Sequence, residues 1–184
     1  MPKLVAFLRA INVGGHTVSM AALREEFLAL GLKDVETFIA SGNVIFTAPP
    51  GSRAALEQKI ERHLHGVLGY EVKTFLRTEA EVAAIAVYKP FSDARTRAAL
   101  ALNVAFLGEP LAPAGVKVLT GMRTPDDDFH VNGREMYWLC RQRQSESRFT
   151  NVRFERAVGS KATFRGLKTI VKLAAKYSWT REGS

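Results

Sequence analysis

The sequence predicts an α+β protein, and two features of the chain support this prediction. In the first half, short apolar stretches typical of strands alternate with amphipathic stretches typical of helices. Their order is strand, helix, strand, strand, helix, strand, which is that of a ferredoxin-like split βαβ fold. In the second half, Asn132-Gly133 separates two apolar stretches, and this dipeptide is a strong hairpin signal. We therefore expect a ferredoxin-like first half with an α+β second half packed against it.

The first half, residues 1–77, is predicted to form a four-stranded antiparallel sheet in the order 4-1-3-2. Strands are expected at residues 3–11, 35–40, 44–47 and 71–77, and helices near 19–30 and 52–68, both on one face of the sheet. Ser19 and Ser52 precede the two helical patterns, and serine is a preferred N-cap residue. The first strand is apolar at both odd and even positions, so we expect both of its faces to be covered.

The second half, residues 78–184, is predicted to be an α+β subdomain that ends in two helices. Its expected elements are a helix opened by the capping box Thr78 to Glu81, a short helix at 92–100, an apolar strand at 101–107 that contains Asn103, a hairpin with strands at 129–131 and 134–141, and helices near 147–158 and 163–177. Pro113 and Gly115 favour a loop that feeds a short strand. The run Asp126 to Asp128 is typical of a solvated turn, and no internal repeat is evident at a fixed period.

Charge is distributed unevenly along the chain. The net charge is +8, and residues 141–184 hold all of this excess, with 11 Lys or Arg against 3 Asp or Glu. The excess suggests an acidic partner for this end of the molecule, although a basic surface also serves solubility alone. The single cysteine, Cys140, cannot form an intrachain disulfide, and no apolar stretch reaches membrane-spanning length. We therefore expect a cytoplasmic protein that does not bind a membrane.

Three motifs together resemble one known family. They are Leu-Arg-Ala-Ile-Asn-Val-Gly-Gly at residues 8–15, Ser-Gly-Asn-Val-Ile-Phe at 41–46, and Ala-Thr-Phe-Arg-Gly-Leu-Lys-Thr-Ile-Val-Lys-Leu at 162–173. On these motifs the chain is similar, over essentially its whole length, to the domain of unknown function 1697 family. In the family's pattern, asparagine and tryptophan stand where this chain has Gly166 and Leu167. The resemblance implies a bacterial cytoplasmic α+β protein with a ferredoxin-like half, and it implies no established activity.

A candidate ligand site follows from the predicted order of the strands. Because strands one and three are antiparallel neighbours in this fold, the end of one lies beside the start of the other. The residues expected to converge there are Arg9, Asn12, Gly14, Gly15, Ser41 and Asn43, joined by Arg165 from the start of the last helix. The set offers hydrogen-bond donors and no carboxylate, which suits a phosphate or carboxylate ligand. The alternative is that these groups only satisfy one another and the loop backbone.

The last predicted helix is a second candidate surface. At about 100° per residue, Arg165, Lys168, Lys172 and Lys176 fall in one narrow sector, and apolar residues occupy most of the remaining arc. A stripe of this kind is able to follow the phosphates of a nucleic acid. A solvated helix face explains the same pattern without any partner.

The sequence leaves three functions open. The first is a binding module for a phosphorylated or other anionic ligand, with nucleic acid included. The second is an enzyme that acts on a small anionic substrate at the edge between Arg9 and Asn43, with His16 as a candidate acid or base. The third is a scaffold that forms homodimers without catalysis. No spacing indicates a metal site or a cofactor, no catalytic residue is predicted, and Cys140 is expected to pack in the core.

Overall fold

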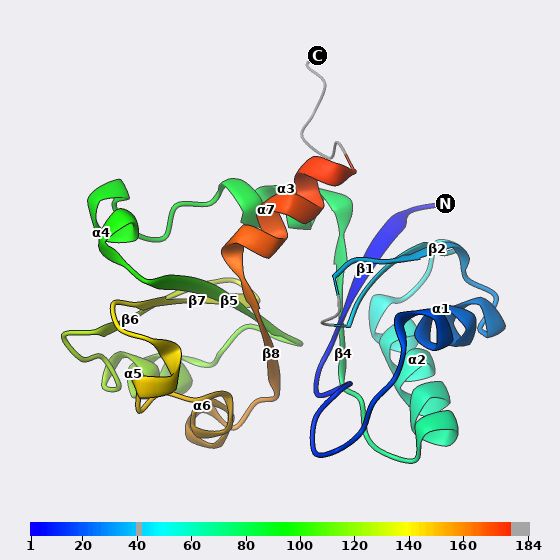
Figure 1. Cartoon of the computed structure of the whole chain (residues 1–184), viewed down its shortest axis with the longest axis horizontal. Helices are drawn as coiled ribbons and strands as arrows, with labels where there is room; N and C mark the ends of the chain where they lie inside the picture. The colour runs from blue at the N-terminus through cyan, green and yellow to red at the C-terminus, as the bar shows by residue number, and fades with distance from the viewer. Residues whose placement is uncertain (40–41, 178–184) are drawn as a thin grey trace. The chain divides into compact units, whose positions relative to one another are not determined.

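The computed structural model of the protein describes residues 1–39 and 42–177. These residues form two compact units, of which the first is Met1–Ala83 and the second begins at Ala84. Each unit contains one four-stranded antiparallel sheet with helices beside it (Figure 1). The predicted α+β class is therefore confirmed. Within the described part of the chain, no helix combines the length and apolar character needed to cross a bilayer.

The first unit has the predicted ferredoxin-like topology. Its elements are β1 (Lys3–Leu8), α1 (Met20–Ala29), β2 (Lys33–Thr37), β3 (Asn43–Thr47), α2 (Arg53–Leu68) and β4 (Thr74–Thr78). The strands lie in the order β2-β3-β1-β4, so the predicted order 4-1-3-2 is confirmed. Both predicted caps form, because the hydroxyl of Ser19 accepts from the N–H of Ala22 and that of Ser52 accepts from Ala55.

The core of the first unit lies between its two helices and one face of its sheet. Leu23 of α1 and Ile60 of α2 belong to a single buried cluster with Leu8 of β1. On the opposite face of β1, Val5 and Phe7 are also 0% exposed. Burial on both faces explains why the sequence of β1 is apolar without alternation.

The second unit has more elements than the first. They are α4 (Asp93–Ala98), β5 (Ala101–Leu107), α5 (Pro113–Thr120), β6 (Asp127–Asn132), β7 (Glu135–Cys140), the 3₁₀ turn η1 (Gln144–Glu146), α6 (Asn151–Val158), β8 (Ala162–Gly166) and α7 (Leu167–Lys176). The helix α3 (Glu79–Val87) leads into it from β4. The strands lie in the order β6-β7-β5-β8, and the Asn132-Gly133 hairpin between β6 and β7 is confirmed.

The two sheets share one topology. The run β5-α5-β6-β7-α6-β8 repeats the run β1-α1-β2-β3-α2-β4, and in both sheets the first strand lies between the third and the fourth. The tetrapeptide Val-Ala-Phe-Leu occurs in both first strands, at residues 5–8 and 104–107. In the pairing register Val5 lies opposite Arg77, and Val104 lies opposite Arg165. The structure thus contains a repeat of fold that the sequence shows only in this short match.

Two predicted elements of the second half are wrong. The segment expected to be a loop feeding a strand is helix α5, which has proline in its first turn, where the missing N–H is not needed. The segment 163–166, expected to open the last helix, pairs with β5 as strand β8. Pairing satisfies its backbone at the sheet edge, and the helix α7 begins only at Leu167.

Candidate functional site

The edge predicted to hold a ligand in the first unit is present as a backbone arrangement. Phe7 at the end of β1 lies opposite Asn43 at the start of β3, and the N–H of Leu8 donates to the carbonyl oxygen of Gly42 at 2.9 Å. A Cβ atom at Gly42 would lie 2.8 Å from the side chain of Ile11, so this close approach needs glycine. Ser41 lies outside the described residues.

The amide side chains at this edge hold the loops themselves. Asn12 accepts from the N–H of Val18 at 2.7 Å through its Oδ1. Asn43 is 0% exposed and donates through its Nδ2 to the carbonyl oxygen of Phe38 at 2.9 Å. These bonds give both amides a role in the loop backbone, which agrees with the alternative of mutual satisfaction. A ligand at this edge remains a prediction.

The glycine loop is ordered by a tyrosine. The Tyr70 hydroxyl donates to the carbonyl oxygen of Ile11 at 2.6 Å, and the ring of His16 stacks on the Tyr70 ring with centroids 3.9 Å apart. Gly14 and Gly15 are exposed and have φ angles of 67° and 83°. His16 therefore has a packing role in this loop, and its predicted role as an acid or base is untested.

Arg165 lies in the second unit, in strand β8, and its predicted place on the last helix is wrong. Its side chain is 8% exposed, and its Nη1 donates to the Thr163 hydroxyl and to the carbonyl oxygen of Phe164, both at 2.8 Å. Burial lowers the pKa of Arg165 to about 10, so the guanidinium is still charged at neutral pH. It contributes a fixed positive charge two residues before Leu167, the first residue of α7.

The three lysines of the predicted stripe lie on α7 and are exposed. They are Lys168, Lys172 and Lys176, each four residues from the next, so they share one side of the helix. The Nζ of Lys176 lies 5.2 Å from the centre of the Tyr177 ring. Lys168 and Lys172 also line a groove, which the sequence did not reveal.

This groove, here named the α7 groove, is an open cavity of about 680 Å³ in the second unit. The end of α4, the start of β5 and the junction between β8 and α7 contribute its lining. The residues that line it are Thr96, Arg97, Ala99, Leu100, Ala101, Leu102, Asn103, Gly166, Leu167, Lys168, Val171 and Lys172. Three of these described residues are cations, and none is an Asp or Glu.

Asn103 is the unusual residue of the α7 groove. It lies on β5, opposite Gly166 of β8, and is only 9% exposed. Its Nδ2 has no hydrogen-bond partner among the described residues and is shielded from solvent. Leaving such a donor unmet costs about 1–3 kcal/mol. Asn103 lines the groove, and χ2 of asparagine is soft, so an acceptor bound there would meet this donor once the amide rotates.

The N-terminus of α7 opens into the same groove without a cap. Its N-cap is Gly166, which has no side chain to accept from the first turn, and no acidic residue lies in that turn. Within residues 1–39 and 42–177, no ion pair or hydrogen bond involves the side chain of Arg97, Lys168 or Lys172. The positive end of the helix and these cations therefore reinforce one another.

At the corresponding position of the first unit, the start of the helix is closed by a capping box. There α3 follows β4, and Thr78 and Glu81 form a reciprocal capping box, with bonds of 2.7 and 3.2 Å. Leu4 takes the place of Asn103, since it lies opposite Thr78 as Asn103 lies opposite Gly166. A cavity of about 500 Å³ lies at this end too, but its Arg53 pairs with Glu81 at 3.0 Å.

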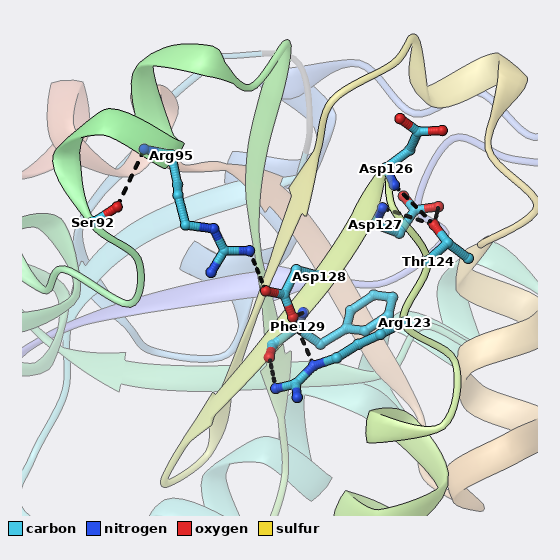
Figure 2. Close-up of polar contacts among 8 residues, drawn as sticks. All are labelled: Ser92, Arg95, Arg123, Thr124, Asp126, Asp127, Asp128 and Phe129. Atoms are coloured by element: carbon cyan, nitrogen blue, oxygen red, sulfur yellow. Dashed lines mark hydrogen bonds and ion pairs between the residues drawn. The ribbon is translucent and has the colours of Figure 1, made fainter.

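The aspartate run is only in part the solvated turn that the sequence predicted. Asp126 is exposed just before β6, whereas Asp127 and Asp128 are the first two residues of that strand. Figure 2 shows the carboxylate of Asp128 between the guanidinium groups of Arg95 and Arg123, and the Arg123 Nε lies 2.7 Å from it. Burial alone would raise the pKa of Asp128, but the Arg95 hydrogen bond, the N–H of Phe129 and the two arginine charges hold it below its usual value.

The neighbouring Asp127 is buried and holds the hairpin to the following turn. It accepts from the Trp138 indole N–H at 2.8 Å and from the Ser147 hydroxyl at 2.9 Å. Within the described ranges, no group of three or more His, Cys, Asp or Glu side chains is arranged to hold a metal ion. Asp127 and Asp128 therefore have structural partners, and the α7 groove is the better candidate for a ligand site.

The geometry defines an α+β protein of two ferredoxin-like units with a basic groove in the second. The chain belongs to the family described as Protein of unknown function (DUF1697), whose model matches residues 1–137. It is also similar to the solved structure of conserved bacterial protein SP0830 from Streptococcus pneumoniae, with 25% identity, a TM-score of 0.75, and coverage of 97% of this chain and 99% of that one. No curated protein matches the chain. The helix α7 follows the part matched by the family model.

Proposed function

We propose that the protein is a binding module for a small anionic ligand, and that the ligand binds in the α7 groove. The observation that carries this proposal is the buried Nδ2 of Asn103, which has no acceptor among the described residues. An anion in the groove would supply that acceptor. It would also accept from the uncapped N–H groups of α7, which is how helix N-termini bind phosphate and carboxylate groups.

The composition of the groove favours binding over catalysis. The described residues that line it include Arg97, Lys168 and Lys172 but no carboxylate, imidazole or thiol. Cations and amide donors complement an anion, whereas acid–base chemistry needs a group that titrates near neutral pH. The anion predicted from the sequence is thus retained, and the groove is a second place for it besides the edge at Arg9.

Isothermal titration calorimetry with inorganic phosphate and pyrophosphate tests the proposal. We expect the double variant Lys168→Gln/Lys172→Gln to lose at least about tenfold in affinity, because each charge-assisted hydrogen bond contributes about 1.5–3 kcal/mol. The matched control is Lys117→Gln/Lys161→Gln, which removes two exposed lysines that do not line the groove. No binding by the wild type, or equal losses in both double variants, would reject the α7 groove as the site.

A polyanion is the second candidate, and the exposure of Lys168, Lys172 and Lys176 on one side of α7 favours it. Each phosphate contact releases counterions, so log K falls with log salt by about 0.7–0.9 per contact. Replacing the three lysines by Gln should flatten this slope by about two to three units. Fluorescence anisotropy with labelled single- and double-stranded oligonucleotides measures it, and absence of binding at physiological salt would remove this candidate.

A further inference from the structure

We infer that the ligand of the α7 groove is a phosphate monoester of an aliphatic chain. This inference rests on the proposed function and adds the chemical class of the ligand. It is carried by the lining of the groove, which combines exposed aliphatic side chains with three cations and the amide of Asn103.

The apolar part of the groove is unusually exposed. Leu100 is 68% exposed and Val171 is 44% exposed, and both line the groove beside Lys168 and Lys172. Leu102, Leu167 and two alanines complete the wall. Contact between aliphatic surface and water is unfavourable, so an aliphatic ligand that covers this surface gains binding free energy. An inorganic anion would use only the polar groups of the lining and leave the aliphatic side chains exposed.

The volume and lining of the groove favour an aliphatic ligand over a lone phosphate or a nucleotide. About 680 Å³ lies within the range of sites that hold small organic molecules, and it exceeds what a lone phosphate fills. The described lining contains no Phe, Tyr, Trp or His, so a nucleotide base would find no ring on which to stack. An aliphatic body therefore fits the wall better than an aromatic one.

The charge of the lining residues favours phosphate over carboxylate as the head group. Arg97, Lys168 and Lys172 provide three positive charges, and Asn103 and the first turn of α7 provide further donors. A phosphate monoester presents nearly two negative charges and three acceptor oxygens at neutral pH. A carboxylate presents one charge and two oxygens, so it leaves more of these donors unmatched.

Calorimetry with a homologous series of butyl, hexyl and octyl phosphate, each below its micelle concentration, tests the inference. We expect affinity to rise by roughly threefold to fourfold per added CH₂, the factor that corresponds to burial of one methylene, until the wall is covered. Octanoate and adenosine monophosphate are the comparison ligands. Octyl phosphate should bind at least about tenfold more tightly than either.

A matched pair of valine substitutions locates the chain on the groove wall. Val171 and Val118 are both 44% exposed on helices, but only Val171 lines the groove. Val171→Thr should weaken octyl phosphate by roughly threefold or more and leave inorganic phosphate unchanged, whereas Val118→Thr should change neither. Both substitutions replace a methyl by a hydroxyl on an exposed surface, so folding should be retained.

The outcomes separate the two proposals. If inorganic phosphate binds and the alkyl chain adds nothing, the anion site stands and the aliphatic ligand is rejected. If octanoate binds more tightly than octyl phosphate, the phosphate head group is rejected. If adenosine monophosphate binds more tightly, the aliphatic body is rejected. If no anion in the set binds, the proposed function fails as well.

Discussion

The two units of the protein differ most at the place where the fourth strand of each sheet passes into a helix. In the first unit, Thr78 caps α3 and Glu81 completes the capping box. In the second unit, the N-cap of α7 is Gly166, which makes no side-chain cap, and Lys168 lies in the first turn of the helix. Across the sheet, apolar Leu4 faces the first junction and Asn103 faces the second.

The difference arises from side chains, because the strand order and the register between the first and fourth strands are the same in both sheets. The first junction satisfies its own helix N–H groups and adds negative charge, so it has no need of an anion. The second has no side-chain cap for these N–H groups, leaves the Nδ2 of Asn103 without a partner among the described residues, and adds positive charge. The junction between the fourth strand and the following helix is thus capped in the first unit and uncapped in the second, and we place the ligand at the uncapped junction.

Buried arginine does not distinguish the units. Arg77 of β4 is 0% exposed and Arg165 of β8 is 8% exposed, and each lies opposite the valine of the shared tetrapeptide. Since both units bury an arginine at the same register, its burial belongs to the shared fold. The ligand site depends instead on the residues that follow it.

The largest predicted effect tests whether the two cores are equivalent. Leu8 and Leu107 end the shared tetrapeptide, and each is buried in the helix-side core of its own unit. Leu8→Ala and Leu107→Ala should each lower the free energy of unfolding by about 2–5 kcal/mol. Urea unfolding followed by circular dichroism measures both. A negligible loss for either variant would show that the shared tetrapeptide does not have the same role in the two cores.

Exchange of the residues that face the junctions should have opposite effects in the two units. Asn103→Leu removes an unmet buried donor and should raise the free energy of unfolding by about 1 kcal/mol, while it abolishes phosphate binding. Leu4→Asn places such a donor in the first core and should lower stability by at least about 2 kcal/mol. Thermal unfolding and calorimetry on both variants check this. Loss of stability in Asn103→Leu would mean that the amide has a partner in solution.

Removal of the cap in the first unit should have a moderate effect. Thr78→Ala removes the hydroxyl that accepts from the N–H of Glu81 at 3.2 Å, and it should lower stability by about 0.5–2 kcal/mol. No such loss is expected at Gly166, which has no side chain to remove. Thermal unfolding of Thr78→Ala, compared with the exposed control Thr120→Ala, measures the cap.

The smallest effect concerns acid stability. On the edge strand β6, Asp128 has a folded pKa below its usual value. Its ion pairs therefore stabilise the protein above the unfolded value of about 3.9, and this stabilisation is lost as pH falls through the lower, folded value. Because Arg95 and Arg123 are partly exposed, the contribution should be below about 1 kcal/mol. Urea midpoints of wild type and Asp128→Asn should differ at pH 6 and converge near pH 2.

The sequence predicts the first unit well, because its signals are local. Ser19, Ser52 and the capping box at Thr78 mark helix starts, and the apolar run of β1 marks a strand covered on both faces. The strand order then follows from the fold class.

The second unit is harder to predict, because its signals depend on tertiary contacts. Thr163 to Gly166 continue the helical pattern of α7, and only their pairing with β5 makes them a strand. Pro113 suggests a loop until it is seen in the first turn of α5. Asn103 is visible in the sequence as a lone amide in an apolar strand, but the lack of a partner for it is a property of the fold.

Transfer of the capping box into the second unit tests most directly whether the open N-terminus of α7 is the anion site. Gly166 has a φ of −61°, and a Cβ atom there would meet nothing within 4 Å, so a threonine fits. Gly166→Thr/Thr169→Glu rebuilds the capping box of Thr78 and Glu81, and Gly166→Thr/Thr169→Gln does so without added charge. Both variants should be more stable by about 1 kcal/mol, or about 2–4 °C in Tm.

The decisive measurement is the affinity of inorganic phosphate for these two variants beside the wild type. We predict that both variants lose at least about tenfold in affinity, with the larger loss for the glutamate variant, because its charge repels the anion as well as closing the helix end. Unchanged phosphate affinity in a glutamine variant whose Tm has risen would contradict the claim that the open N-terminus of α7 is the anion site.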